Sequence, residues 1–171
     1  MSLKKRIKKV SLKTFDVRKH LTPKYLSWMN DKSLLKYSEQ RHYKNTRTNC
    51  LNYFKEMKKK GNLVFALFFN KEHVGNLSLH IDKLNSIADI SIIIGVTQYH
   101  NKGLGSEAYV TAINYLKKEN LVSKVTSGTM SINKSMIKLL KKVGMKKDGI
   151  RKNHYIFSKK RVDLVYYSLY L

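Results

Sequence analysis

Hydrophobic and polar positions follow two periods along the chain, and their order predicts a mixed α/β protein. Runs in which apolar residues are continuous or alternate predict strands, whereas apolar residues at every third or fourth position predict helices. Strands are expected at Val10–Phe15, Leu63–Phe69, Val74–Ile81, Ile87–Gly95, Ser123–Met130, Lys146–Tyr155 and Val162–Tyr170. Helices are expected from Pro23, at Lys32–Tyr37, within 46–61, from Leu104 to Leu116 and within 132–144.

Individual residues mark where several of these elements begin and end. Thr22 before a proline is a typical helix start, and Gly61 and Gly144 follow the last periodic positions of two helices. The strand Ile87–Gly95 is almost entirely apolar at its end, which indicates a central place in the sheet. The elements follow one another without a linker or an internal repeat. We therefore expect a single domain over residues 1–171, built on a mixed sheet.

The net charge of the chain bears on which classes of molecule it could bind. The chain has 35 Lys and Arg residues against 11 Asp and Glu, a net charge of +24. A positive field of this size attracts polyanions, so nucleic acid, a phosphorylated cofactor or an anionic substrate would each be favoured. The lysines are spread along the whole chain, however, which is also what a lysine-rich composition alone would produce.

Other features of the composition indicate the compartment. The single cysteine, Cys50, excludes a disulfide framework and a cysteine-based zinc site. No apolar run reaches the roughly 18 residues that span a membrane. The amino-terminal segment MSLKKRIKKV is basic but lacks the apolar stretch and cleavage site of a secretory signal. We therefore expect a cytoplasmic protein without membrane insertion.

A glycine-rich loop, QYHNKGLGSEA, connects the central strand to the longest predicted helix. Peptide N–H groups of such a loop and of a helix N-terminus bind phosphate, and His100 or Lys102 can add a side-chain donor. Gly103, Gly105 and Ala108 also fit the dinucleotide pattern G-x-G-x-x-A, but the loop is too long and the acidic residue expected about 20 positions later is absent. The Walker A pattern is absent as well. A capped helix without a ligand is the remaining alternative.

From Ile87 to Met145 the chain resembles the acetyl-CoA-binding core of the GNAT acetyltransferases, in particular the branch of ribosomal-protein N-terminal and amino-sugar acetyltransferases. IIIGVTQYHNKGLGSEA resembles the strand end and diphosphate loop of that branch, with His100 where Gln or Arg is usual. NKSMIKLLKKVGM resembles the later helix, whose Asn meets the pantetheine arm. The resemblance implies acetyl-CoA as donor, no metal, and cofactor contacts at Ile93, Ile94, Gly95, His100, Asn101, Lys102, Gly103, Leu104, Gly105, Ser106 and Asn133.

The resemblance also implies a fold and a reaction. The fold is a central, mostly antiparallel sheet with two splayed parallel strands, flanked by helices. A neutral amine attacks the thioester directly, so a base is needed within reach of the amine. Asp89 falls near the position of the family's carboxylate, Glu39 is a second candidate and His80 a third. The alternatives are that Asp89 caps a strand end, that Glu39 pairs with Arg41, and that His80 packs in its strand.

A proton donor for the departing thiolate is less evident. Many relatives have a Tyr seven residues after the Asn, and some have a Ser three residues after it; here these positions are Leu140 and Met136. Neither side chain can donate a proton. Tyr155 on the following strand is the candidate that remains, with water as the alternative.

The amine that accepts the acetyl group is the part of the reaction that the sequence determines least. A charge of +24 would repel a basic protein amino terminus or a polyamine, so a small anionic amine such as a nucleotide-linked amino sugar is favoured. Arg41, His42 and Lys44 offer phosphate contacts, or form a solvated loop. A protein N-terminal acetyltransferase and a non-catalytic acetyl-CoA-binding protein stay open, as does a homodimer. A nucleic-acid-binding module is not favoured, because no helix-turn-helix, RNP-type or zinc pattern occurs.

Overall fold

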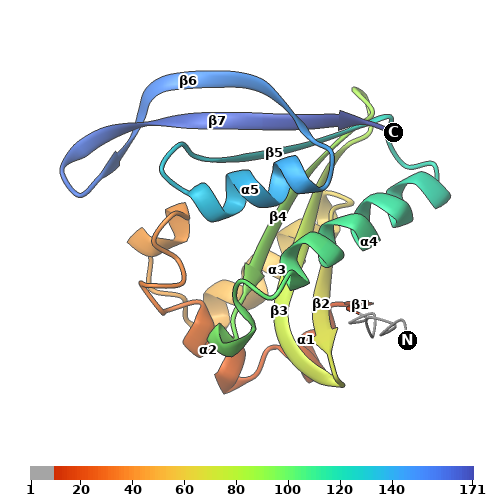
Figure 1. Cartoon of the computed structure of the whole chain (residues 1–171). Coiled ribbons are helices and arrows are strands. Elements are labelled where there is room, and N and C mark those ends of the chain that lie inside the picture. Colours follow the sequence, from red (N-terminus) through yellow and green to blue (C-terminus); the bar gives the residue numbers. More distant parts are fainter. Residues whose placement is uncertain (1–9) are drawn as a thin grey trace, which may run out of the picture.

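Seven strands form one sheet, and helices cover both of its faces (Figure 1). This computed structural model describes residues 10–171, so the basic amino-terminal segment, with the prediction made for it, lies outside the described residues. The strands are β1 (Ser11–Thr14), β2 (Leu63–Phe69), β3 (Glu72–Asp82), β4 (Ile87–Ile94), β5 (Lys124–Met130), β6 (Lys146–Phe157) and β7 (Lys160–Tyr170). The helices are α1 (Val17–His20), α2 (Pro23–Trp28), α3 (Arg47–Lys59), α4 (Leu104–Lys118) and α5 (Lys134–Lys142), with short 3₁₀ helices η1 (Glu39–His42) and η2 (Thr97–Tyr99).

The sheet divides where β4 meets β5. The strand order is β1-β2-β3-β4-β5-β7-β6, and every neighbouring pair is antiparallel except β4–β5. The parallel ladder covers only Ile87–Asp89 against Lys124–Thr126. Beyond it the two strands no longer pair and they diverge (Figure 1); the region between these diverging strand segments is called the gap below. This confirms the predicted splayed pair and the central place of β4.

Two cores hold the layers together. The larger lies between the sheet and the α4–α5 layer, and the smaller lies beneath α1, α2 and α3 around Trp28. In α4 the predicted apolar stripe is buried, and so is Tyr109. The Tyr109 hydroxyl donates to the Ile90 carbonyl at 2.9 Å, and the Ser127 hydroxyl donates to the same oxygen at 2.9 Å. These two side chains therefore satisfy the first β4 carbonyl beyond the ladder.

Most helix boundaries follow the predicted signals, with one exception. The Thr22 hydroxyl accepts the Tyr25 N–H at 3.2 Å and so caps α2 as expected. The helix predicted at Lys32–Tyr37 is wrong, because these residues form successive turns. The Asp31 carboxylate accepts the N–H groups of Ser33 and Leu34, which closes a local turn that competes with a continuous helix. The short helix α1 carries too few residues for the periodicity to reveal it.

No helix among residues 10–171 is both long and apolar enough to cross a membrane.

Gly95, directly after β4, packs against the indole of Trp28. A Cβ at this position would overlap the ring, and Trp28 has no room to withdraw because it is only 5% exposed. We expect Gly95→Ala to lower the free energy of unfolding by about 3 kcal/mol, as overpacking of a core does. Gly149→Ala is the matched control, since a Cβ there meets nothing within 4 Å. Urea denaturation of both variants tests this; equal stability would contradict the contact.

Candidate active site

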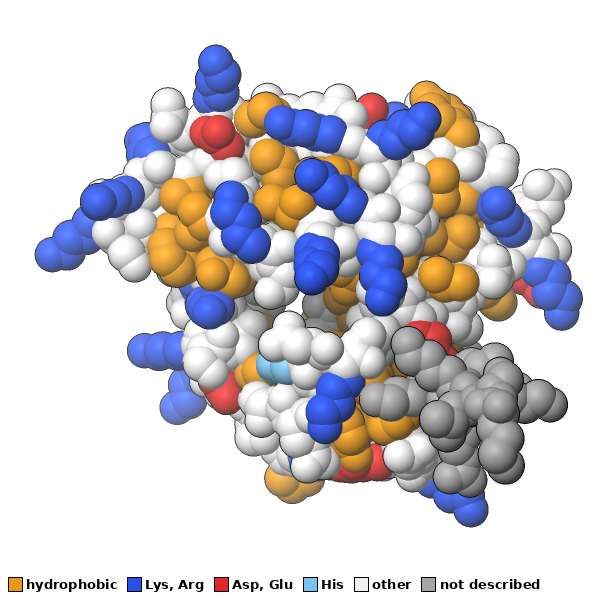
Figure 2. Space-filling model, viewed as in Figure 1, with side chains coloured by type: hydrophobic (Ala, Val, Ile, Leu, Met, Phe, Trp, Pro, Cys, Tyr) orange, Lys and Arg blue, Asp and Glu red, His pale blue; other side chains and the backbone are white. Residues whose placement is uncertain are grey.

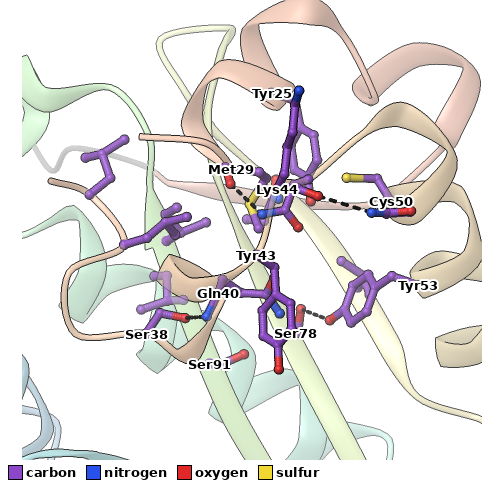
Figure 3. Close-up of a pocket in the computed structure, with 18 of the residues that line it drawn as sticks. Tyr25, Met29, Ser38, Gln40, Tyr43, Lys44, Cys50, Tyr53, Ser78 and Ser91 are labelled. Atoms are coloured by element: carbon purple, nitrogen blue, oxygen red, sulfur yellow. Dashed lines mark hydrogen bonds between the residues drawn. The ribbon is translucent and has the colours of Figure 1, made fainter. Parts of the chain in front are cut away.

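A cavity of about 620 Å³ lies on the α2–α3 side of the sheet, next to the edge of β4 (Figure 3). Hydroxyl, amide and aromatic side chains line it together with aliphatic ones such as Leu34, Leu35 and Ile93, and among residues 10–171 Lys44 is the only lysine in the lining. No Asp or Glu of residues 10–171 lines it. Its principal polar groups are Gln40, Asn45, Tyr53, Ser78, His80 and Ser91.

The floor of the cavity comes from β3 and β4. Asn76, Ser78 and His80 occupy alternate positions of β3, so their side chains share one face. Ser91 of β4 lies directly opposite Ser78. The Tyr53 hydroxyl of α3 lies 3.3 Å from the Ser78 hydroxyl, and this hydrogen bond ties the helix to the floor (Figure 3).

One wall is the loop 31–44. Two asparagines join its ends: the Asn45 N–H donates to the Asn30 Oδ1 at 2.9 Å, and the Asn30 Nδ2 donates to the Asn45 carbonyl at 2.9 Å. The far part of the loop reaches β6, where the Arg41 Nη2 donates to the Ile156 carbonyl at 3.1 Å. These contacts, made at both ends, give the loop a defined shape over the cavity.

His80 and Asp89 lie where the β4–β5 ladder ends and the two strands begin to diverge, a position called the fork below. They are directly opposite in the β3–β4 register, so their side chains project from the same face. His80 lines the cavity, and Asp89 lies next to it at the last β4–β5 pair, where its Oδ2 accepts the Thr126 hydroxyl at 2.8 Å. Burial raises the pKa of Asp89 above its ordinary value, and the Thr126 hydrogen bond and the charge of His80 partly oppose this rise.

The other two predicted catalytic residues lie outside the cavity lining. The Glu39 carboxylate accepts the Arg41 Nη1 at 2.7 Å, the pairing that the sequence left open. Tyr155 is half-buried on β6 near this ion pair. Burial and the charge of Glu39 raise the pKa of its phenol. Of the candidate groups, the structure therefore brings His80 to the cavity and Asp89 beside it.

The glycine loop presents backbone donors at the mouth of the gap. Gly103 is the N-cap of α4 and has a φ of +86°, a conformation that favours glycine. The N–H groups of Leu104, Gly105 and Ser106 belong to the first helical turn, whose donors have no partner within the helix. His100 places a ring nitrogen 2.8 Å from the Ile94 carbonyl, at the end of β4. The exposed Asn101 and Lys102 complete the loop.

Peptide groups of β4 alternate between β3 and the gap. The Gly95 N–H donates to the Val74 carbonyl at 2.8 Å. Since the direction alternates along an antiparallel strand, the N–H and C=O groups of Gly95 and Ile93 point toward β3. Those of Ile94 and Ile92 are directed at the gap. The Ile94 carbonyl is already in contact with His100, so of the predicted contacts in this strand Ile94 offers its N–H to a ligand, and Ile92 is an additional position that the sequence did not indicate.

Asn133 lies across the gap, between β5 and α5. Its Oδ1 accepts the Met136 N–H at 3.3 Å and its Nδ2 donates to the Thr129 hydroxyl at 3.0 Å. The residue therefore caps α5 and fixes the helix to the end of β5.

The acetyltransferase (GNAT) domain family matches residues 11–146. This is more than half of the chain, and the gap, glycine loop and cavity lie in the arrangement just described. The chain belongs to the GNAT acetyltransferase family and is an acetyl-CoA-dependent N-acetyltransferase.

Solved structures share the fold over nearly the full chain. RimL, a ribosomal L7/L12 alpha-N-protein acetyltransferase solved with coenzyme A, has a TM-score of 0.84 at 14% identity and covers 95% of this chain and 94% of its own. Spermidine N-acetyltransferase from Vibrio cholerae, solved with CoA and spermine, has a TM-score of 0.82 at 14% identity, with 94% and 95% covered. The microcin C7 self-immunity acetyltransferase MccE, solved with acetyl-CoA and AMP, has 0.80 at 15%, with 95% and 92% covered. No curated protein sequence matches the chain.

Proposed function

We propose that acetyl-CoA lies in the gap between β4 and β5. Its diphosphate contacts the loop His100–Ser106, where backbone N–H groups and the N-terminus of α4 provide positive potential. A carrier held at this point extends along β4 toward the fork, where the Ile94 N–H and the Ile92 carbonyl are the partners for its pantetheine amides. The thioester then lies near Asp89 and Ser91, beside the cavity.

The acceptor amine enters the cavity from the opposite face. The chemical class of the acceptor is inferred from the lining of the cavity, which has hydroxyls, amides and Lys44 but no carboxylate among residues 10–171. A polycation would find no counter-charge there, whereas a hydroxyl-rich amine would find hydrogen-bond partners. Lys and Arg side chains are also spread over the face that carries α5, β6 and β7 (Figure 2). We propose a small anionic amine, such as a nucleotide-linked amino sugar.

His80 is the proposed general base, with Asp89 next to it. The imidazole accepts a proton from the incoming ammonium, directly or through one water, and the neutral amine attacks the thioester carbonyl carbon. The bond to sulfur breaks, the amide nitrogen loses one proton, and coenzyme A leaves as a thiolate that takes up a proton in its place. The Ile92 N–H, which is directed at the gap, is the donor for the developing oxyanion.

An acceptor panel tests the proposed class. Acetyl-CoA turnover is followed by thiol release with nucleotide-linked amino sugars, free amino sugars, spermidine, and peptides with free amino termini. We expect kcat/KM for the best nucleotide-linked amine to exceed that for spermidine by more than tenfold, because only the anionic acceptor is attracted by the surface. Preference for a peptide would instead favour the second candidate, protein N-terminal acetylation, which is the reaction of RimL.

A further inference from the structure

A second cavity of about 280 Å³ adjoins the first, and four basic residues line it. The two cavities share Met29, Leu35, Gln40, Tyr43 and Lys44. The smaller one adds Lys32, Arg41 and His42, and no Asp or Glu of residues 10–171 lines it. A molecule in the first cavity can therefore extend directly into a positively charged one.

The loop 31–44 holds this charge in place. Lys32 and Lys44 lie close to opposite ends of the loop, and the Asn30–Asn45 hydrogen bonds bring those ends together. The Asn45 Nδ2 adds a third bond to the Met29 carbonyl at 2.6 Å. Positive side chains 12 positions apart in the sequence therefore line the same cavity.

The carboxylates of the same loop are occupied elsewhere. Asp31 accepts the backbone N–H groups of Ser33 and Leu34, and Glu39 pairs with Arg41. Arg41 is further held by the Ser38 and Ile156 carbonyls, so its charge is largely compensated. Neither Lys32 nor Lys44 makes an ion pair with any residue of 10–171.

We propose that the second cavity is the subsite for a phosphate group of the acceptor, with Lys32 and Lys44 as its principal ligands. The inference rests on the proposed function, since it places the phosphate of an acceptor whose amine lies in the first cavity. Tyr43, shared by both cavities and 68% exposed, presents a ring on which the aromatic part of such an acceptor can stack. Phosphate specificity is thus set by the loop.

The test compares two variants with the same change of charge. Lys32→Ala/Lys44→Ala removes the proposed ligands, whereas Lys36→Ala/Lys55→Ala removes two exposed lysines that line neither cavity. With a phosphate-bearing amino sugar, we expect KM to rise at least tenfold in the first variant and less than twofold in the control, with kcat nearly unchanged. A charge-assisted contact supports a change of this size. With the phosphate-free amino sugar, Lys32→Ala, whose side chain lines the second cavity but not the first, should differ from the single control Lys36→Ala by less than twofold.

A binding measurement separates this inference from the proposed function. AMP and inorganic pyrophosphate are titrated calorimetrically against each protein with coenzyme A at saturation, so that the glycine loop is already filled. Binding that is lost only in Lys32→Ala/Lys44→Ala supports the subsite even if no nucleotide-linked amine is acetylated. Turnover of such an amine that both variants retain equally overturns the subsite and leaves the proposed function intact. The subsite is also overturned if neither probe binds the unaltered chain. It is overturned as well if an acidic peptide, titrated in the same way, is the only ligand that binds Lys32→Ala/Lys44→Ala more weakly than the unaltered chain.

Discussion

Replacing Gly103 with valine and Gly105 with leucine is expected to weaken acetyl-CoA binding at least 100-fold. Gly103 has a φ of +86°, which a β-branched residue adopts only with strain. A Cβ at Gly105 would lie 2.7 Å from the Leu139 Cδ1, so Leu139 must move and a leucine side chain would crowd the contact between α4 and α5. Both changes move the N–H groups of the first turn of α4, on which the proposed diphosphate contact depends. Calorimetric titration with acetyl-CoA measures the loss.

The control for this double variant must share its strain without touching the loop. Gly61→Val/Gly149→Leu meets that need, because Gly61 also has a positive φ, +72°, and a Cβ at Gly149 meets nothing within 4 Å. We expect the control to be somewhat less stable but to bind acetyl-CoA normally. Unchanged affinity in Gly103→Val/Gly105→Leu would mean that the diphosphate is not held by this loop, and the proposed cofactor site would then be wrong.

Periodicity predicted those parts of the fold that are long and regular. The strands β2 to β7 and the helices α3, α4 and α5 were expected within a few residues of their bounds, because their apolar faces are wide enough to set the pattern. The turns at 32–37 were missed because a side-chain cap competes locally with the helix. The gap itself followed from the family resemblance. Which peptide groups of β4 face it depends on the pairing with β3, which no property of the β4 sequence reveals.

The site was predictable where it lies on strands. Polar residues at every second position of β3, Asn76, Ser78 and His80, interrupt an apolar run, and this alternation could have indicated a polar floor, although only His80 was named as a candidate from the sequence. The loop wall had no such sign. It depends on bonds between residues 15 positions apart, Asn30 and Asn45, and 115 positions apart, Arg41 and Ile156. For the same reason the sequence did not reveal that His80 lines the cavity and Glu39 does not, and the choice between them as base stays a prediction.

Substitution of the two residues at the fork is expected to lower kcat by about 10²- to 10⁴-fold, the usual range for loss of a general base. His80→Gln removes the proposed proton acceptor while keeping a polar side chain of similar size. Asp89→Asn removes the neighbouring charge but can still accept the Thr126 hydroxyl. If the two residues act as a unit, the double variant will be hardly slower than either single variant. Steady-state and single-turnover kinetics with one acceptor test this cycle.

The stability of Asp89→Asn tests independently whether the Asp89 carboxylate has a functional rather than a structural role. Burial raises the pKa of Asp89 in the folded chain, so the ionised carboxylate costs stability at neutral pH, and this cost disappears as the pH falls through the raised pKa. We therefore expect Asp89→Asn to be at least as stable as the unaltered chain at pH 7, with an advantage that shrinks on acidification, measured by urea denaturation across pH. A variant that is inactive yet no less stable is the signature of a functional carboxylate.

Glu39→Gln separates the competing base. Glu39 is half-exposed and paired with Arg41 outside the cavity lining, so its loss should change kcat less than threefold. Any effect should instead appear as a looser loop, with a higher KM for the acceptor. If Glu39→Gln abolished turnover while His80→Gln left kcat intact, the base would have to be assigned to the loop, and the fork would serve only to hold the sheet open.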